Sequence, residues 1–282
     1  MSKSDNDESA RALMPLLDAV CEQARSPAAT ALVFDWILQH LVRLHHSEVF
    51  WGDRMLILDR SAEFLRDPCF LASMASADSS TGANQYQSPG GIAWRYHTLI
   101  WAARSCLALP GDYVECGVYR GDMTWVVTEN VDLRSAGKTF FIYDTFAGFN
   151  LEYSSPADFP DNPAFFDFAD QAYKAPGIEA DVRRRFSSKP EVVITKGTVP
   201  NVLYSGAPAA IAFLHLDMNS PAAELGALEV LFDRVTPGGI VVFDDYGWAF
   251  YRKQKQTADS FVNARSHFIM ELPTGQGLLI KR

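Results

Sequence analysis

The chain is poor in cysteine, with four in 282 residues. Cys21, Cys69, Cys106 and Cys116 are widely separated, form no Cys-x-x-Cys pair, and fall within apolar segments. Such isolated thiols are typical of reduced, buried structural residues. We therefore expect neither a disulfide framework nor a zinc site.

Basic residues are also scarce relative to acidic ones. Lys and Arg number 25 against 34 Asp and Glu, which gives a net charge of −9. A surface of this sign repels a nucleic-acid backbone and an anionic membrane, so we expect neither as a partner. No apolar run approaches the roughly 20 residues that would span a bilayer. The first residues are acidic and lack an apolar stretch of signal-peptide length, so we expect a cytoplasmic protein.

The pattern of the sequence changes near residue 90, from helical segments to alternating strands and helices. This change predicts an N-terminal helical extension over 1–90 and an α/β domain over 91–282. Apolar residues recur at helical spacing from Pro27 to Leu44, and a second helical stretch runs from Arg54 to Leu65. A polar loop over 73–91 follows, which is either a hinge or a lid. The apolar stripe of the first helix either completes a core of its own or joins a second copy, and we predict a homo-oligomer formed through these helices.

From residue 91 onward, strand and helix patterns alternate. This order predicts a doubly wound, mostly parallel seven-stranded sheet of the Rossmann-like α/β class. The last two strand patterns, HFIMELP and GLLIKR, are separated only by TGQG. That short connection predicts an antiparallel hairpin at the sheet edge.

The polar residues that follow each strand are the candidates for binding, because ligands of such sheets lie beyond the carboxyl ends of the strands. Glu115 ends the first strand and is followed by Gly117 and Gly121. The dinucleotide fingerprint GxGxxG is absent, which disfavours NAD and FAD. Asp144 ends the second strand, where a carboxylate reaches the two ribose hydroxyls of an adenosine; it could instead cap the turn that follows. Two acids without a pyrophosphate cradle favour a positively charged nucleoside such as S-adenosylmethionine.

Three further aspartates follow two later strands: Asp217 after one, and Asp244 and Asp245 after the next. If these strands are neighbours, about 4.8 Å apart, the three carboxylates converge. Clustered carboxylates repel one another unless a cation neutralises them, and an all-oxygen set suits Mg²⁺ or another hard divalent ion. The alternative is that these aspartates only cap the turns and the helix that follow.

The sequence resembles the TylF/MycF-type branch of class I S-adenosylmethionine-dependent O-methyltransferases, which includes enzymes that methylate sugars of antibiotics. The resemblance rests on YVECGVYRGDMT, IYDTFAGF, VRRRF with ITKGTVPNVL, and LHLD with GALEVLFDRVTPGGIVVFDDYG. It implies a metal site at Asp217, Asp244 and Asp245. A hydroxyl polarised by such a metal can pass its proton to a nearby carboxylate, and Asp217 is the candidate for this catalytic base. The resemblance also implies a cofactor site at Glu115, Gly117, Tyr119, Gly121, Thr124, Asp144, Thr145, Lys196 and Gly197.

The sequence departs from the family after Asp217. Family members usually carry a second acid two residues later and then a Leu-Tyr pair, whereas this chain has Asn219 followed by Ser220 and Pro221. The acceptor is therefore not carried over from the family. His215 either packs against a helix or lies near the site. Arg95 either holds the methionine carboxylate or is a solvated or interface residue.

Two other features leave alternatives open. The aromatic-rich insert over 151–176 either closes over the acceptor or is pinned to the core. Gln276, in the final turn, either borders the pocket or only shapes the hairpin.

These observations predict a metal-assisted O-methyltransferase that acts on a hydroxyl of a small molecule, for example the sugar of a glycosylated natural product or of a polysaccharide precursor. Two alternatives remain. One is an NAD(P)-dependent oxidoreductase on the same sheet, and the other is a cofactor-binding helper subunit that transfers no methyl group.

Overall fold

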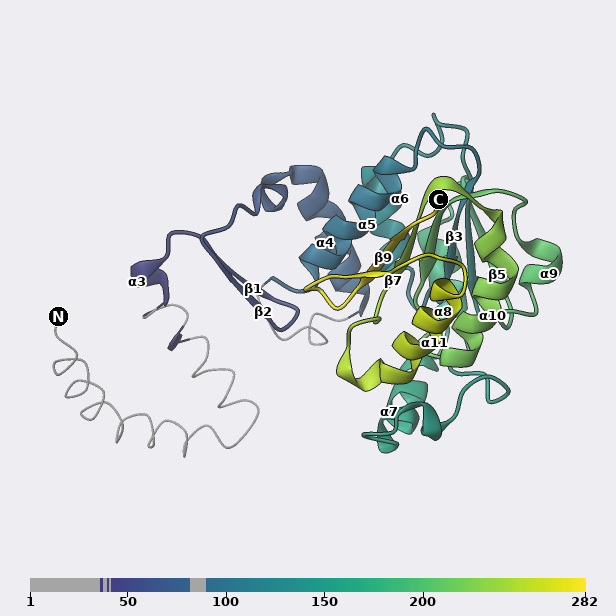
Figure 1. Ribbon diagram of the computed structural model, residues 1–282. Helices are drawn as coiled ribbons and strands as arrows, with labels where there is room; N and C mark the ends of the chain where they lie inside the picture. The colour runs from purple at the N-terminus through teal and green to yellow at the C-terminus, as the bar shows by residue number, and fades with distance from the viewer. Residues whose placement is uncertain (1–35, 38–39, 41, 82–89) are drawn as a thin grey trace. The chain divides into compact units, whose positions relative to one another are not determined.

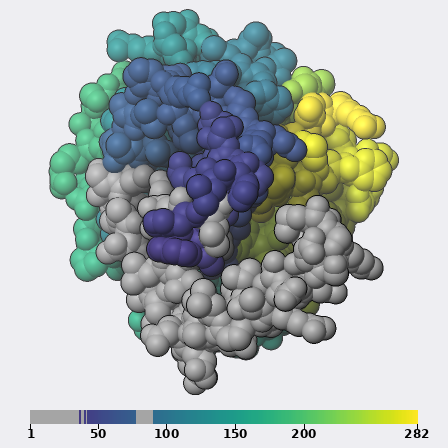
Figure 2. All heavy atoms as spheres, turned by 90° about the vertical axis from the view of Figure 1, so that its left-hand side faces the viewer, coloured from purple at the N-terminus to yellow at the C-terminus, as the bar shows by residue number. Residues whose placement is uncertain are grey.

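The computed structural model describes residues 36–37, 40, 42–81 and 90–282 (Figure 1). Figure 2 shows these residues in colour as spheres. They fall into two compact units: the first contributes described residues up to 62 together with 90–91, and the second contributes 63–81 and 92–282. The boundary at residue 90 as a functional division stays a prediction. Among the described residues, no helix combines the length and apolar character needed to cross a membrane.

The first unit contains a β-hairpin where a helix was expected. Strands β1 (Val49–Gly52) and β2 (Met55–Leu58) pair in antiparallel register. The two residues between them, Asp53 and Arg54, both have positive φ, 51° and 59°. Positive φ at both central residues is the geometry of a two-residue hairpin turn that matches the twist of the strands. The helix predicted from Arg54 to Leu65 is therefore wrong.

The helix predicted from Pro27 to Leu44 lies largely outside the described residues. Its described C-terminal end includes the short helix α3 (Arg43–His45). The homo-oligomer predicted through this segment accordingly stays a prediction.

The second unit begins with the short helix η2 (Glu63–Arg66) and helix α4 (Pro68–Thr81). Asp67 Oδ1 accepts the backbone N–H of Cys69 at 2.8 Å, which satisfies a free donor of the first turn. Pro68 stands at the first helical position, where its missing N–H costs nothing. Asp67 and Pro68 thus start a helix, and the prediction that residues 73–81 belong to a polar loop is wrong.

The second unit is built on a seven-stranded sheet, and the predicted fold class is confirmed. The strands are β3 (Asp112–Cys116), β4 (Phe140–Asp144), β5 (Val192–Lys196), β6 (Ile211–Leu216), β7 (Val235–Phe243), β8 (Met270–Glu271) and β9 (Gly277–Ile280). Their order is β5-β4-β3-β6-β7-β9-β8. Strands β3 to β7 pair in parallel, whereas β9 pairs antiparallel with both β7 and β8, as the hairpin pattern predicted.

Helices connect and cover these strands (Figure 1). From β3 the chain moves outward to β4 and β5, then returns to place β6 beside β3 and moves outward the other way. Right-handed crossovers place the helices of the two halves on opposite faces of such a sheet. Helix α6 contacts both α4 and α5 in the first half, and α10 contacts both α9 and α11 in the second. Their bounds are α5 (Ala93–Ser105), α6 (Asp122–Asn130), α8 (Ile178–Arg185), α9 (Leu203–Gly206), α10 (Pro221–Leu231) and α11 (Arg252–Asn263).

The remaining short elements lie in the connections. They are η3 (Pro156–Asp158), α7 (Ala164–Tyr173), η4 (Phe232–Arg234) and η5 (Ala249–Tyr251). The core is deepest at β6, whose six residues are all buried. Tyr113, Phe140 and Phe213 from three neighbouring strands pack their rings together there, with centroids 5.3–6.2 Å apart. Because β6 is central, His215 on this strand is buried in the sheet.

Candidate active site

The candidate site lies where the strand order reverses, between β3 and β6. Such a switch point leaves a crevice beyond the carboxyl ends of the strands. The sheet ladder continues past the strand ends, because the N–H of Asp217 donates to the carbonyl of Cys116 and that of Asp244 to Leu216, both at 2.9 Å. These bonds hold the residues that follow β6 and β7 side by side at one edge of the sheet.

Asp217, Asp244 and Asp245 converge at this edge. One carboxylate oxygen from each lies within 4.8 Å of the other two, as the strand adjacency predicted. Burial, and then the charges of Asp244 and Asp245, raise the pKa of Asp217 well above its usual value. Ser220 rather than Asp217 caps α10, since its hydroxyl accepts the N–H of Ala223 at 3.3 Å. The three-oxygen donor set therefore fits a hard divalent cation.

Arg95 of α5 contacts two of these three aspartates. A single guanidinium nitrogen, Nη1, lies 2.6 Å from Asp244 Oδ2 and 3.0 Å from Asp245 Oδ1. Gln276 donates to the other oxygen of Asp244 at 2.9 Å. Burial opposes ionisation, but Arg95 together with His215 and Gln276 holds the pKa of Asp244 well below its usual range. The interpretation of Arg95 as solvated is wrong, because only 6% of its surface is exposed.

A buried ion pair lies beneath the aspartates. His215 Nδ1 is 2.8 Å from Glu115 Oε1, and both residues are 1% exposed. The other oxygen of Glu115 accepts the hydroxyl of Thr124. Burial disfavours the imidazolium, but Asp244 and Glu115 outweigh it and raise the pKa of His215 to about 10. His215 therefore links the end of β3 to the acidic group on β7, with Nε2 3.8 Å from Asp244 Oδ1.

Asp144 joins the loops that follow β3 and β4. Its Oδ2 accepts the N–H groups of Val118 at 2.6 Å and Tyr119 at 2.9 Å, and its Oδ1 accepts that of Phe146 at 2.6 Å. The bond to Phe146 is the turn-capping contact that was one of the two interpretations. A carboxylate offers about four acceptor positions, so these bonds leave one for a further donor.

The two glycines after β3 are required by close approaches of the chain. Gly117 has φ +85°, and a Cβ there would lie 1.9 Å from the carbonyl oxygen of Asp217. Gly121 has φ +79°, and its Cβ would meet the ring of Phe186 at 2.7 Å. L residues adopt such φ values at a cost, and backbone cannot yield as a side chain does. Gly117 thus brings the first loop directly against the residue proposed as base.

The other predicted cofactor residues are held by neighbours at the same edge. Thr145 donates its hydroxyl to the carbonyl of Gly148 at 2.7 Å. Lys196 is exposed, and its Nζ lies 2.7 Å from Glu179 Oε2 on α8. Gly197 donates its N–H to the carbonyl of Asp144 at 2.8 Å. These contacts place all three beside the ends of β4 and β5.

Three further residues, Asn219, Tyr173 and Glu224, lie near the aspartates and were not assigned a role from the sequence. Asn219 has φ +54° and donates its side-chain amide to the hydroxyl of Tyr173 at 2.9 Å. Glu224 on α10 is 2% exposed and accepts the N–H of Met218 at 3.4 Å. Burial raises the pKa of Glu224 to about 8. An acid in the first turn of a helix ordinarily indicates a favourable contact with the helix dipole, so the burial of Glu224 could not be predicted from the sequence.

The insert over 151–176 is attached to the site and carries an aromatic cluster. Ser220 donates its hydroxyl to the carbonyl of Tyr153 at 2.8 Å. Phe159 and Phe166 are buried with Tyr251 in a cluster separate from the main core. Phe168, by contrast, is 69% exposed. The insert is therefore pinned by its first phenylalanines, and closure over an acceptor stays a prediction.

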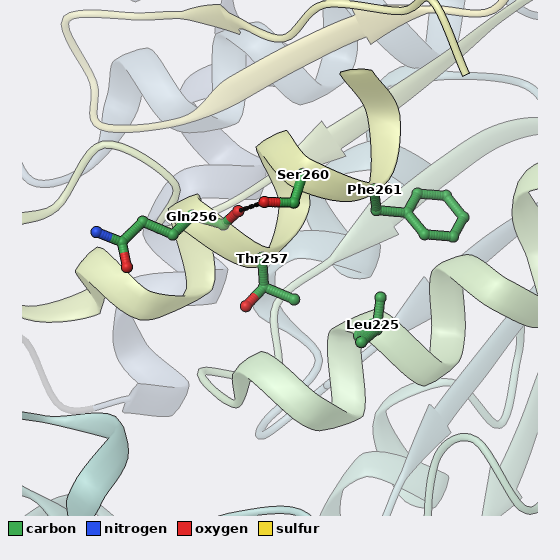
Figure 3. Close-up of a pocket in the computed structure, with 5 residues that line it drawn as sticks. All are labelled: Leu225, Gln256, Thr257, Ser260 and Phe261. Atoms are coloured by element: carbon green, nitrogen blue, oxygen red, sulfur yellow. Dashed lines mark hydrogen bonds between the residues drawn. The ribbon is translucent and has the colours of Figure 1, made fainter. Parts of the chain in front are cut away.

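A hollow lies between α10 and α11. It has a volume of about 440 Å³ and is lined by Leu225, Gln256, Thr257, Ser260 and Phe261. Figure 3 shows Leu225 of α10 pointing toward α11. None of these five side chains carries a charge, so the hollow offers no acid–base chemistry.

Comparison with known proteins agrees with this geometry. The family described as macrocin-O-methyltransferase (TylF) matches residues 101–268, more than half of the chain. The mycinamicin III 3''-O-methyltransferase of Micromonospora griseorubida is 27% identical over 147 residues, which cover 49% of this chain and 56% of that protein. The chain thus matches little more than half the length of this relative.

Two solved structures share the fold. The O-methyltransferase NovP superposes with a TM-score of 0.58 at 19% identity, over 66% of this chain and 79% of that one. A calicheamicin methyltransferase superposes with a TM-score of 0.56 at 15% identity, over 76% and 93%. The family match spans strands β3 to β7 and the three aspartates, so the chain belongs to the macrocin-O-methyltransferase (TylF) family.

Proposed function

We propose that the protein is an S-adenosylmethionine-dependent O-methyltransferase that acts on a hydroxyl of a small molecule, with a sugar as the favoured acceptor class. Family membership supports the reaction, and the names of the related enzymes record methyl transfer. The observation that carries the proposal is the convergence of three carboxylates at the switch point of the sheet. Such a cluster suits the activation of a hydroxyl group.

The residues proposed to bind the cofactor lie at or just after the carboxyl ends of β3, β4 and β5 and at the start of α6. They are Glu115, Gly117, Tyr119, Gly121, Thr124, Asp144, Thr145, Lys196 and Gly197. When bound, S-adenosylmethionine supplies a methyl group on a sulfonium, which transfers by in-line displacement. The remaining acceptor position of Asp144 is available to a ribose hydroxyl. Glu115 has two partners, His215 and Thr124, so by the same count it also keeps acceptor positions for a cofactor donor.

Asp217, Asp244 and Asp245 are the residues that would hold Mg²⁺ or another hard divalent cation. Such a cation lowers the pKa of a hydroxyl that it polarises. Asp217 is the proposed base, because one of its carboxylate oxygens lies within 4.8 Å of those of Asp244 and Asp245, close to where a cation would hold the acceptor hydroxyl. Gln276 orients Asp244, and the backbone approach of Gly117 fixes the position of Asp217.

A transfer assay tests this proposal. The protein is incubated with methyl-deuterated S-adenosylmethionine and a panel of sugar nucleotides and glycosides, and products are read by mass spectrometry. We expect label in a sugar acceptor with Mg²⁺, loss of label with a chelator, and a rate about 100- to 10,000-fold lower in Asp217→Asn. Asp233→Asn, at a side chain that is 86% exposed, is the matched control and should retain the rate.

Two results would contradict the proposal. Absence of label in every acceptor, together with no cofactor binding by calorimetry, would overturn the methyltransferase function. A wild-type rate in Asp217→Asn would overturn the role of that residue as base while leaving the reaction standing. The nicotinamide-dependent alternative is not supported by the family match.

A further inference from the structure

Arg95 occupies a position between two of the three clustered carboxylates. Its Nη1 atom alone approaches both, at 2.6 Å from Asp244 Oδ2 and 3.0 Å from Asp245 Oδ1. Arginine more commonly pairs with carboxylates through two parallel bonds from its fork. Here one nitrogen bridges two acids, which is the arrangement of a bridging cation.

The space between Asp244 and Asp245 admits only one bridging cation. A Mg²⁺ ion bound to both aspartates would lie about 2.0–2.1 Å from its ligand oxygens. The guanidinium nitrogen already fills the region between the same two carboxylates, and two cations that close would repel. Arg95 and a metal ion therefore cannot bridge Asp244 and Asp245 through these oxygens at the same time.

The charges around the site are consistent with either the Arg95 guanidinium or a divalent ion between the aspartates. The described acids at the site are Asp217, Asp244, Asp245, Glu115 and Glu224, and the basic groups are Arg95 and His215. His215 is already engaged by Glu115. Its Nε2 lies 3.8 Å from Asp244, so Arg95 is the nearer counter-charge of Asp244 and Asp245, and the acids retain a negative excess that attracts a divalent ion.

The structure also provides a second contact for the arginine. Its guanidinium carbon lies 5.2 Å from the centre of the Trp248 ring, within the range of a cation–π interaction. A guanidinium that leaves the carboxylates can remain over this ring.

We propose that Arg95 is an internal counter-cation, which bridges Asp244 and Asp245 in the metal-free protein and is displaced when a divalent cation binds. The inference rests on the proposed cation site and extends it to a residue of α5. It implies that Arg95 weakens metal binding while stabilising the empty site. A positioning residue that stays in place would instead strengthen metal binding by orienting its ligands.

Mn²⁺ binding followed by electron paramagnetic resonance tests this, with purified full-length protein and neither cofactor nor acceptor present. The variants are Arg95→Met, which removes the charge at similar length, and Arg95→Lys, which retains it. Arg104→Met is the matched control on the same helix, because Arg104 donates to the carbonyl of Asn130 instead. We expect the Kd for Mn²⁺ to fall at least about tenfold in Arg95→Met and to stay near wild type in the other two.

Thermal unfolding gives an independent measurement on the same proteins. Without metal, Arg95→Met should unfold at a lower temperature than wild type, because two buried carboxylates lose their counter-charge. Added Mn²⁺ should raise its Tm by more than it raises that of wild type.

The possible failures are distinguishable. A Kd in Arg95→Met equal to or higher than that of wild type overturns the inference and leaves the cation site intact. Absence of Mn²⁺ binding in every protein overturns the cation site itself, and the inference with it. If Arg95→Met does not fold, Arg95→Lys still decides, because a tenfold weaker Kd there would show that Arg95 orients the ligands.

Discussion

Replacing Gly117 by alanine should destabilise the protein through two separate effects. An alanine at φ +85° pays about 1–2 kcal/mol for the left-handed conformation. Its Cβ would also lie 1.9 Å from the carbonyl oxygen and 2.5 Å from the carbonyl carbon of Asp217, so one of the two loops must move. Overpacking of this kind costs about 1–3 kcal/mol. The sum predicts a loss of about 2–5 kcal/mol.

Gly137→Ala separates these two effects. Gly137 also has positive φ, +65°, but a Cβ there meets nothing within 4 Å. It should therefore cost only about 1–2 kcal/mol, the conformational part. The entropy that alanine removes from the unfolded chain is the same in both variants and cancels in their difference.

Urea unfolding followed by circular dichroism, in the presence of chelator, measures both free energies of unfolding. We expect Gly117→Ala to be less stable than Gly137→Ala by about 1–3 kcal/mol. Equal losses in the two variants would refute the close approach of the first loop to Asp217. Gly117→Ala should also weaken divalent-cation binding, because the displaced loop carries Asp217, whereas Gly137→Ala should leave it unchanged.

Two further predictions concern buried side chains. With chelator present, the free energy of unfolding should fall as the pH rises from about 4.5 to about 8, because burial raises the pKa of Glu224 to about 8 in the folded state. Glu224→Gln should remove this contribution, and a slope identical to wild type in pH-dependent urea unfolding would contradict it. Phe159→Ala should make the insert over 151–176 more susceptible to limited proteolysis, because Phe159 is 2% exposed within the aromatic cluster. Phe168→Ala, at a side chain that is 69% exposed, should not, and equal susceptibility of the two variants would count against the pinned insert.

The convergence of the aspartates could be predicted from the sequence. Asp217 and Asp244 each follow a short apolar strand directly, and parallel strands end at the same edge of a sheet. This prediction required only that β6 and β7 be neighbours, which the pairing of Leu216 with Phe243 confirms. The fold and the proximity of these carboxylates thus follow from local patterns and general rules of α/β topology.

The errors in the N-terminal part have local causes. Met55–Leu58 is an apolar run that periodicity alone assigns equally to a helix or a strand. The turn before it, Asp53-Arg54, adopts positive φ at both residues without the glycine that usually signals such a hairpin. Asp67 and Pro68, just beyond the end of the helix predicted from Arg54 to Leu65, instead start α4.

The contacts of Arg95 could not be predicted from spacing. Its partners Asp244 and Asp245 are 149 and 150 residues away along the chain. No periodic pattern connects α5 to the loop after β7, so only the folded arrangement brings them together. The same holds for Gln276, which lies in the turn between β8 and β9 yet orients Asp244.

Calorimetric titration of Mg²⁺ is the most direct test of the central claim that the aspartates form a divalent-cation site. Wild type, Asp244→Asn and the exposed-site control Asp233→Asn would be titrated after removal of metal by chelation and dialysis. The structure predicts a binding isotherm in wild type and in Asp233→Asn that disappears in Asp244→Asn. An isotherm of equal affinity in Asp244→Asn, or none in wild type, would contradict the account.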